Sequence, residues 1–148
     1  MKKYYIINIF IISFSIAFFS CKKDEVTSNV PVIKLLSVSN ATVKQFTDSF
    51  SITFEYTDGD GDIGNINPDE NNLQVKDKRL AKPDYYFVKP LAPPNSDIKI
   101  KGKLIVQLKN TFLLGTSNSE VTTFELKLRD RKGNWSNTII TPNITIIK

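Results

Sequence analysis

The chain has 148 residues, a formal net charge of +5, one cysteine and no histidine. The absence of histidine excludes a histidine general base, Ser-His and Cys-His nucleophile pairs, and zinc sites of the Cys/His type. The positive charge is mild and falls to +3 without residues 1–20, which hold Lys2, Lys3 and no acid; with no basic helix or aromatic-basic motif, it does not indicate a nucleic-acid partner.

Residues 1–20 have the order of a secretory signal peptide. Two lysines open the segment, the apolar run 4–19 follows, and the single cysteine, Cys21, comes directly after Ser20. This arrangement resembles the lipobox of bacterial lipoproteins, in which the cysteine thiol is joined to diacylglycerol, the leader is removed and the new amino terminus is acylated. The resemblance implies lipid attachment at Cys21. The alternative is a single membrane-spanning helix over 4–20, which is at the short limit of the about 20 residues that a span needs.

Residues 21–30 are predicted to form the lipidated cysteine and a flexible tether. The Lys-Asp-Glu at 23–25 resembles the short signal found after the cysteine in Bacteroidetes-type lipoproteins of the outer leaflet of the outer membrane. The alternative for these residues is a solvated charged tether. The expected location is therefore the cell envelope, with lipid anchoring in the outer membrane and possible surface exposure.

Residues 31–148 are predicted to form one domain built of strands. The clearest strand is 50–56, where Phe50, Ile52, Phe54 and Tyr56 alternate with polar residues. The other predicted strands are 32–38, 73–76, 85–88, 98–108 with a possible bulge at Gly102, 124–128, and 139–147 with an edge or bend at Pro142. The segment 110–120 could hold one turn of helix. About seven short strands with turn-rich loops predict an all-β immunoglobulin- or fibronectin-like β-sandwich.

The loop after the second predicted strand is acidic. Asp58, Asp60 and Asp62 alternate with glycines in the sequence Asp-Gly-Asp-Gly-Asp-Ile-Gly, so the three carboxylates can point at one centre. Calcium binds six to eight hard oxygens of this kind. The loop is not an EF-hand, because Ile63 stands where that loop needs glycine. It resembles the acidic loops of calcium-binding cadherin-like sandwiches. The alternative is a plain tight turn, for which Asp-Gly is a strong signal.

A second segment follows the sixth predicted strand and contains Asp130. In a seven-strand sandwich the loops after the second and sixth strands lie at the same end. We therefore expect Asp130 to approach the three aspartates and complete a calcium site. Asn65 or Asn67 could add a carbonyl oxygen.

The leader, the tether and the segments FEYTDGDGDIG and LRDRKGNWSN together resemble a group of Bacteroidetes-type lipoproteins with one Ig-like domain and no established activity. The resemblance implies location and fold, not a reaction. We expect a non-catalytic module for adhesion, scaffolding or capture of an envelope protein or glycan. The alternatives are an accessory subunit of an envelope assembly and a small carboxylate-dependent hydrolase that uses the four aspartates. Trp135, Tyr85, Tyr86 and Phe87 could stack on sugars, or simply pack in the fold.

Overall fold

The computed structural model describes residues 27–148. The predicted leader, the lipid attachment at Cys21, the alternative span over 4–20 and most of the predicted tether lie outside these residues. The described part of the chain consists of strands and loops without a helix, which confirms the predicted all-β class. Accordingly, residues 27–148 contain no helix of the length and apolarity needed to cross a bilayer.

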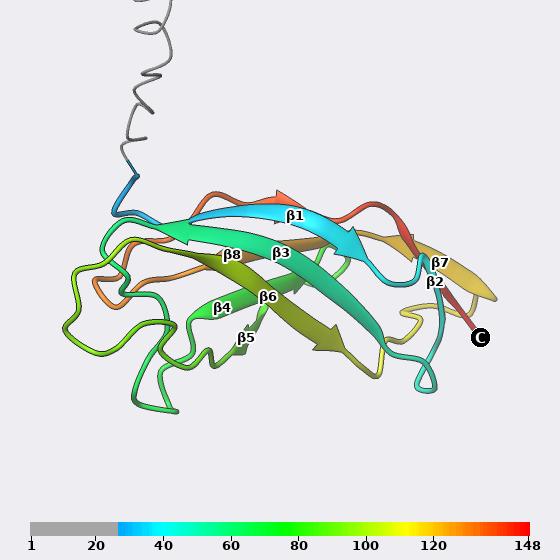
Figure 1. Cartoon of the computed structure of the whole chain (residues 1–148). Helices are drawn as coiled ribbons and strands as arrows, with labels where there is room; N and C mark the ends of the chain where they lie inside the picture. The colour runs from blue at the N-terminus through cyan, green and yellow to red at the C-terminus, as the bar shows by residue number, and fades with distance from the viewer. Residues whose placement is uncertain (1–26) are drawn as a thin grey trace, which may run out of the picture.

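The strands form a β-sandwich (Figure 1). The first layer is an antiparallel sheet in the order β1-β3-β6, with β1 (Val32–Val38), β3 (Phe50–Asp58) and β6 (Ile100–Leu108). The second layer has the order β5-β4-β8-β9, with β4 (Leu73–Asp77), β5 (Asp84–Tyr86), β8 (Phe124–Leu128) and β9 (Ile139–Ile140). A third small sheet has the order β2-β10-β7, with β2 (Thr42–Lys44), β7 (Ser119–Thr122) and β10 (Ile144–Ile147), and here β2 runs parallel to β10.

The connections place segments that are distant in the sequence at one end of the sandwich. The chain crosses from the first layer to the second between β3 and β4 and returns between β5 and β6. It then passes through β7 of the third sheet and re-enters the second layer at β8. The β3–β4 loop and the β8–β9 turn therefore lie together at the end where β1 begins (Figure 1). This is the connectivity of an immunoglobulin- or fibronectin-like sandwich.

The core follows directly from the alternation in β3. Phe50, Ile52, Phe54 and Tyr56 are buried, whereas the residues between them are half-buried. Their rings and methyl groups pack against inward residues of β8, and Phe50 contacts Phe124 with ring centroids 5.3 Å apart. Burial of such side chains contributes about 1.5–3 kcal/mol each.

Several strand predictions need correction. Residues 42–44 form β2, which is too short to show an alternating pattern. Gly102 is not a bulge, because the β3–β6 register runs without a shift through the Tyr56–Gly102 pair. A Cβ on Gly102 would lie 2.4 Å from the Tyr56 hydroxyl, so glycine makes room for that ring. The bulge lies in β1, between Leu35 and Ser37.

The ends of the predicted strands also differ. The predicted strand 85–88 is β5, which ends at Tyr86, and the predicted turn of helix within 110–120 is irregular chain followed by β7. The last predicted strand is divided at Pro142 into β9 and β10, as the bend prediction anticipated. Proline lacks the N–H that an unbroken ladder would use.

An ion-pair network joins β4 to β7. Arg79 contacts Asp77 and Glu120, each at 2.6 Å, and the Thr122 hydroxyl donates to Asp77. Burial alone would raise the pKa of Asp77, but the hydrogen bonds from Arg79 and Thr122 outweigh it and the pKa is lowered. The network ties the small third sheet to the second layer at the end opposite the acidic loop.

Candidate metal centre

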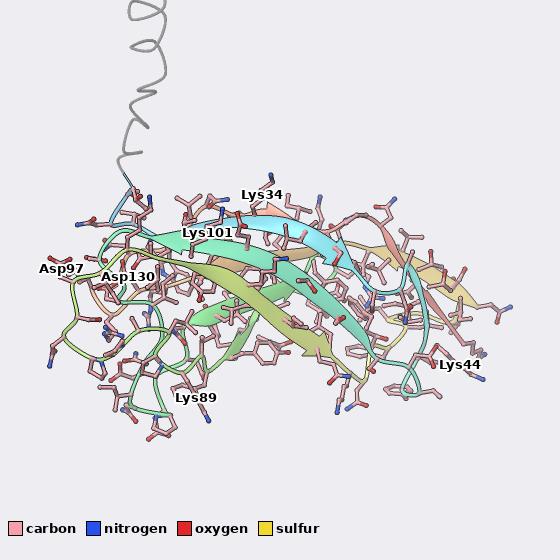
Figure 2. The ribbon with its side chains drawn as sticks, viewed as in Figure 1. Lys34, Lys44, Lys89, Asp97, Lys101 and Asp130 are labelled. Atoms are coloured by element: carbon pink, nitrogen blue, oxygen red, sulfur yellow. The ribbon has the colours of Figure 1, made fainter. Side chains whose placement is uncertain are left out.

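The acidic loop and the β8–β9 turn are held together by backbone contacts. Ile63 and Asp130 form an isolated antiparallel bridge, and the Arg131 N–H donates to the Asp62 carbonyl at 3.1 Å. Figure 2 shows Asp130 and Asp97 at this same end of the sandwich. The fold thus brings together the two loops that were predicted from the sequence to lie at one end of the sandwich.

Asp58, Asp60 and Asp62 form one buried cluster, which we call the aspartate triad. Asp58 is the last residue of β3, and Gly59 and Gly61 allow the chain to curl after it; Gly61 has a φ of +74°. Each carboxylate presents an oxygen within 4.8 Å of those of the other two. The exposed fractions of the three residues are 0, 5 and 7%, so the triad is part of the protein interior.

Most oxygens of the triad accept no hydrogen bond. Asp58 Oδ2 accepts from the Asp62 N–H at 3.0 Å, and Asp60 Oδ2 pairs with the Lys132 ammonium. Asp58 Oδ1, Asp60 Oδ1 and both Asp62 oxygens are buried and accept no hydrogen bond within residues 27–148, although Lys132 Nζ lies 4.0 Å from Asp62 Oδ2. Burial of unpartnered carboxylate oxygens is unfavourable, so these four atoms require an explanation.

The electrostatics of the triad are those of crowded, desolvated anions. Burial, and then the charges of Asp60 and Asp62, raise the pKa of Asp58 to about 6. Burial, followed by the charges of Asp130 and Asp60, also raises the pKa of Asp62. The hydrogen bond from Lys132 lowers the pKa of Asp60. One lysine therefore neutralises one carboxylate, and the other two remain costly to ionise.

Asp130 and Asn65 lie near the triad without joining it. The two oxygens of Asp130 accept from the backbone N–H and the side-chain amide of Asn134 at 2.7 and 2.8 Å, so this carboxylate fixes its own turn. The Asn65 amide donates to Glu70 at 2.7 Å, and the Asn67 amide also faces Glu70. The structure thus brings three of the four predicted aspartates into one group, and it gives Asp130 and Asn65 other partners.

Two residues of the site had no predicted role. Lys132 lies two residues after Asp130, in a turn that was predicted from the sequence to lie at this end. Its positive charge could therefore have indicated a partner for the aspartates. Asn29 had no signal, because its contact is made by folding alone: the Gly59 N–H donates to the Ser28 carbonyl at 2.8 Å, and a Cβ on Gly59 would lie 2.5 Å from Asn29 Oδ1. Asn29, Asp60, Asp62 and Lys132 line one solvent-open hollow of about 470 Å³.

The predicted aromatic residues do not form one platform. Trp135 is half-buried and lies beneath the Arg129 guanidinium, whose carbon is 5.3 Å from the ring centre. Tyr85 and Tyr86 are exposed on β5, at the edge of the second layer.

Comparison with known proteins gives one structural likeness. No family model matches the chain, and no curated protein matches it. A solved structure of a Niemann-Pick type C2 protein from Japanese carpenter ant is 12% identical, with a TM-score of 0.40, and the match covers 81% of this chain and 96% of that one. A likeness at this level carries no argument about function, so function must be argued from the site itself.

Proposed function

We propose that the chain is a lipid-anchored lipoprotein of the bacterial envelope whose β-sandwich is a non-catalytic, calcium-stabilised module for adhesion, scaffolding or capture of a protein or glycan. The observation that carries the calcium part is the set of four buried triad oxygens that accept no hydrogen bond. The anchor and the location rest on the sequence around Cys21 and on its resemblance to lipoproteins.

The donor chemistry of the triad fits calcium. The three side chains offer oxygen atoms alone, and the chain has no histidine and one cysteine far from the loop in sequence. Oxygen-only sites suit Ca²⁺ and Mg²⁺ rather than zinc or copper. Calcium accepts irregular sets of carboxylates and carbonyls, whereas Mg²⁺ demands near-octahedral geometry and keeps several waters. A loop that curls at two glycines favours calcium.

The position of the triad suggests what an ion would stabilise. The triad belongs to the β3–β4 loop, Lys132 to the β8–β9 turn, and Asn29 to the segment that leads into β1. A cation at the triad would therefore fix the β3–β4 loop beside the entry of the chain into the sandwich, and it would compete with the Lys132 ammonium for Asp60. If Cys21 is lipidated, this is the end of the domain nearest to the anchor.

Calcium should raise the thermal stability of the domain. All core residues lie between Ile33 and Ile146, so protein produced from Lys22 onward carries the complete core and can be measured in solution. A ligand at 100 times its Kd that binds only the folded state adds about 2.7 kcal/mol, which corresponds to a rise in Tm of roughly 10 °C. We expect this rise on adding calcium to chelator-treated protein, and a smaller one with magnesium.

Two variants separate ion binding from a merely structural loop. Asp62→Asn should abolish the calcium-dependent rise without lowering the Tm in chelator, because neither Asp62 oxygen accepts a hydrogen bond from the described part of the chain. Asp69→Asn, an exposed aspartate later in the same loop, should keep the full rise. An unchanged Tm in the parent protein over a wide calcium range would leave the triad as a plain turn.

Lipid attachment has its own test, which is independent of calcium. Full-length protein made in a bacterium that processes lipoproteins should incorporate radiolabelled palmitate, and Cys21→Ala should incorporate none. Ser20→Ala, which keeps a small residue before the cysteine, serves as the control. Labelling that persists in the Cys21→Ala protein would refute the anchor while leaving the metal proposal untouched.

A further inference from the structure

The two edges of the sandwich differ in whether a hydrogen-bonded bridge joins the layers. At the β1–β9 edge, the Asn137 side chain accepts from the Ile33 N–H and donates to the Ile33 carbonyl, each at 2.9 Å, so it bridges the first layer to the turn before β9. At the other edge, where β5 and β6 are the outermost strands, no hydrogen bond within residues 27–148 joins the two strands. Among the described residues, the β5–β6 edge thus lacks a bridge of the kind that Asn137 makes at the other edge.

A cavity of about 380 Å³ opens at this unclosed edge. We call it the edge pocket. Its lining comes from both layers, and it is apolar or aromatic except for Lys89 and Gln107. Leu73 and Val88 are buried parts of the core, whereas Phe87 and Leu104 are half-buried and lead outward to Tyr86. The volume lies in the range of pockets that hold small organic ligands, which are also mainly apolar with a few polar groups.

One positively charged side chain, Lys89, belongs to the lining of the edge pocket. Lys89 is the single charged residue of the lining, it is exposed, and it forms no ion pair with residues 27–148. It lies on the loop that follows β5 (Figure 2). A mainly apolar pocket with an exposed lysine among its lining residues is complementary to a molecule with an apolar tail and an anionic head.

We propose that the edge pocket binds a single-chain amphiphile with a carboxylate head, such as a fatty acid, with its tail between the sheets and its carboxylate at Lys89. Each methylene that leaves water for the apolar lining contributes to binding. The Lys89 ammonium selects the anionic head. This site shares no residue with the hollow at the triad, although the backbone of Val88 and Leu91 is hydrogen-bonded to Asn65 and Ile63 of the β3–β4 loop.

The direct test is displacement of cis-parinaric acid, a fluorescent fatty acid, from protein that begins at Lys22. We expect saturable enhancement of the probe fluorescence, reversed by palmitate at lower concentration than by hexadecanol, with each compound below its solubility or aggregation limit and in the presence of chelator. The absence of saturable binding would overturn the proposal. Equal displacement by palmitate and hexadecanol would overturn the assignment of the head to Lys89.

Two pairs of variants locate the site. Lys89→Glu should weaken palmitate binding by about fivefold, the upper end of the range for loss of an exposed ion pair, with no change for hexadecanol. Lys34→Glu on the outer face of β1 should change neither. Leu104→Trp should fill the pocket and abolish probe binding, whereas Val32→Trp at the opposite edge should not. If Leu104→Trp does not fold, the Lys89 pair alone decides, because both of those lysines are exposed.

Discussion

Replacement of Gly64 by alanine is expected to lower the free energy of unfolding by about 2–5 kcal/mol. Gly64 ends the acidic loop with a φ of +89°, and a Cβ there would lie 2.1 Å from the Lys89 carbonyl oxygen and 2.8 Å from Pro90 Cα. Residues 89 and 90 cannot move away freely, because hydrogen bonds hold the backbone on both sides of them. Asn65 donates to the Val88 carbonyl, and Leu91 donates to the Ile63 carbonyl, on either side of the overlap.

Gly133→Ala is the matched control for that variant. Gly133 also has a positive φ, +92°, but no heavy atom lies within 4 Å of the position of its Cβ. Its alanine variant should therefore show only the conformational cost of about 1–2 kcal/mol. Urea unfolding of both variants measures the difference. Equal losses would mean that the loop does not pack against residues 89–90 as described.

Phe54→Ala is expected to cost about 3–5 kcal/mol, the range for removal of a buried aromatic ring. Phe54 is fully buried at the middle of β3, and its backbone pairs with Leu35 on one side and Leu104 on the other. The ring therefore lies in the core beneath the middle of the first layer, where neighbouring strands have little freedom to close a cavity.

Urea unfolding measures the stability of Phe54→Ala, and Val121→Ala serves as its control. Val121 lies on β7 with more than half of its surface exposed, so its truncation should change stability by less than about 0.5 kcal/mol. A loss below about 1 kcal/mol for Phe54→Ala would show that β3 does not carry the core. The Phe54 prediction concerns the fold alone, and its failure would not bear on calcium.

The parts of the fold that were predictable are those with a strong local period. β3 alternates over its whole length, and its partner β6 and the facing strand β8 of the second layer repeat the pattern at their buried positions. β2 was not predictable, because three residues carry no period and its position depends on pairing with β10, about 100 residues later in the chain. Gly102 was misread for a related reason: the sequence shows a glycine in a strand, but not the Tyr56 ring that needs the space.

In the candidate site, too, the features set by local sequence were predictable and those set by contacts between distant segments were not. Alternating aspartates and glycines after a strand predicted the triad, because short spacing alone brings those carboxylates together. Asp130 accepts from Asn134, and the Asn65 amide N–H donates to Glu70. Neither contact was predictable from the sequence, and the role of either residue as a ligand stays a prediction. The pairing of Asp60 with Lys132 crosses between two loops, so it emerged only with the topology.

The most direct test of the calcium proposal is isothermal titration calorimetry of calcium into metal-free protein that begins at Lys22. We expect one site per chain in the parent protein and in Asp69→Asn, and no binding in Asp62→Asn. Absence of calcium binding to the folded parent protein at millimolar concentration, or undiminished binding to Asp62→Asn, would contradict it.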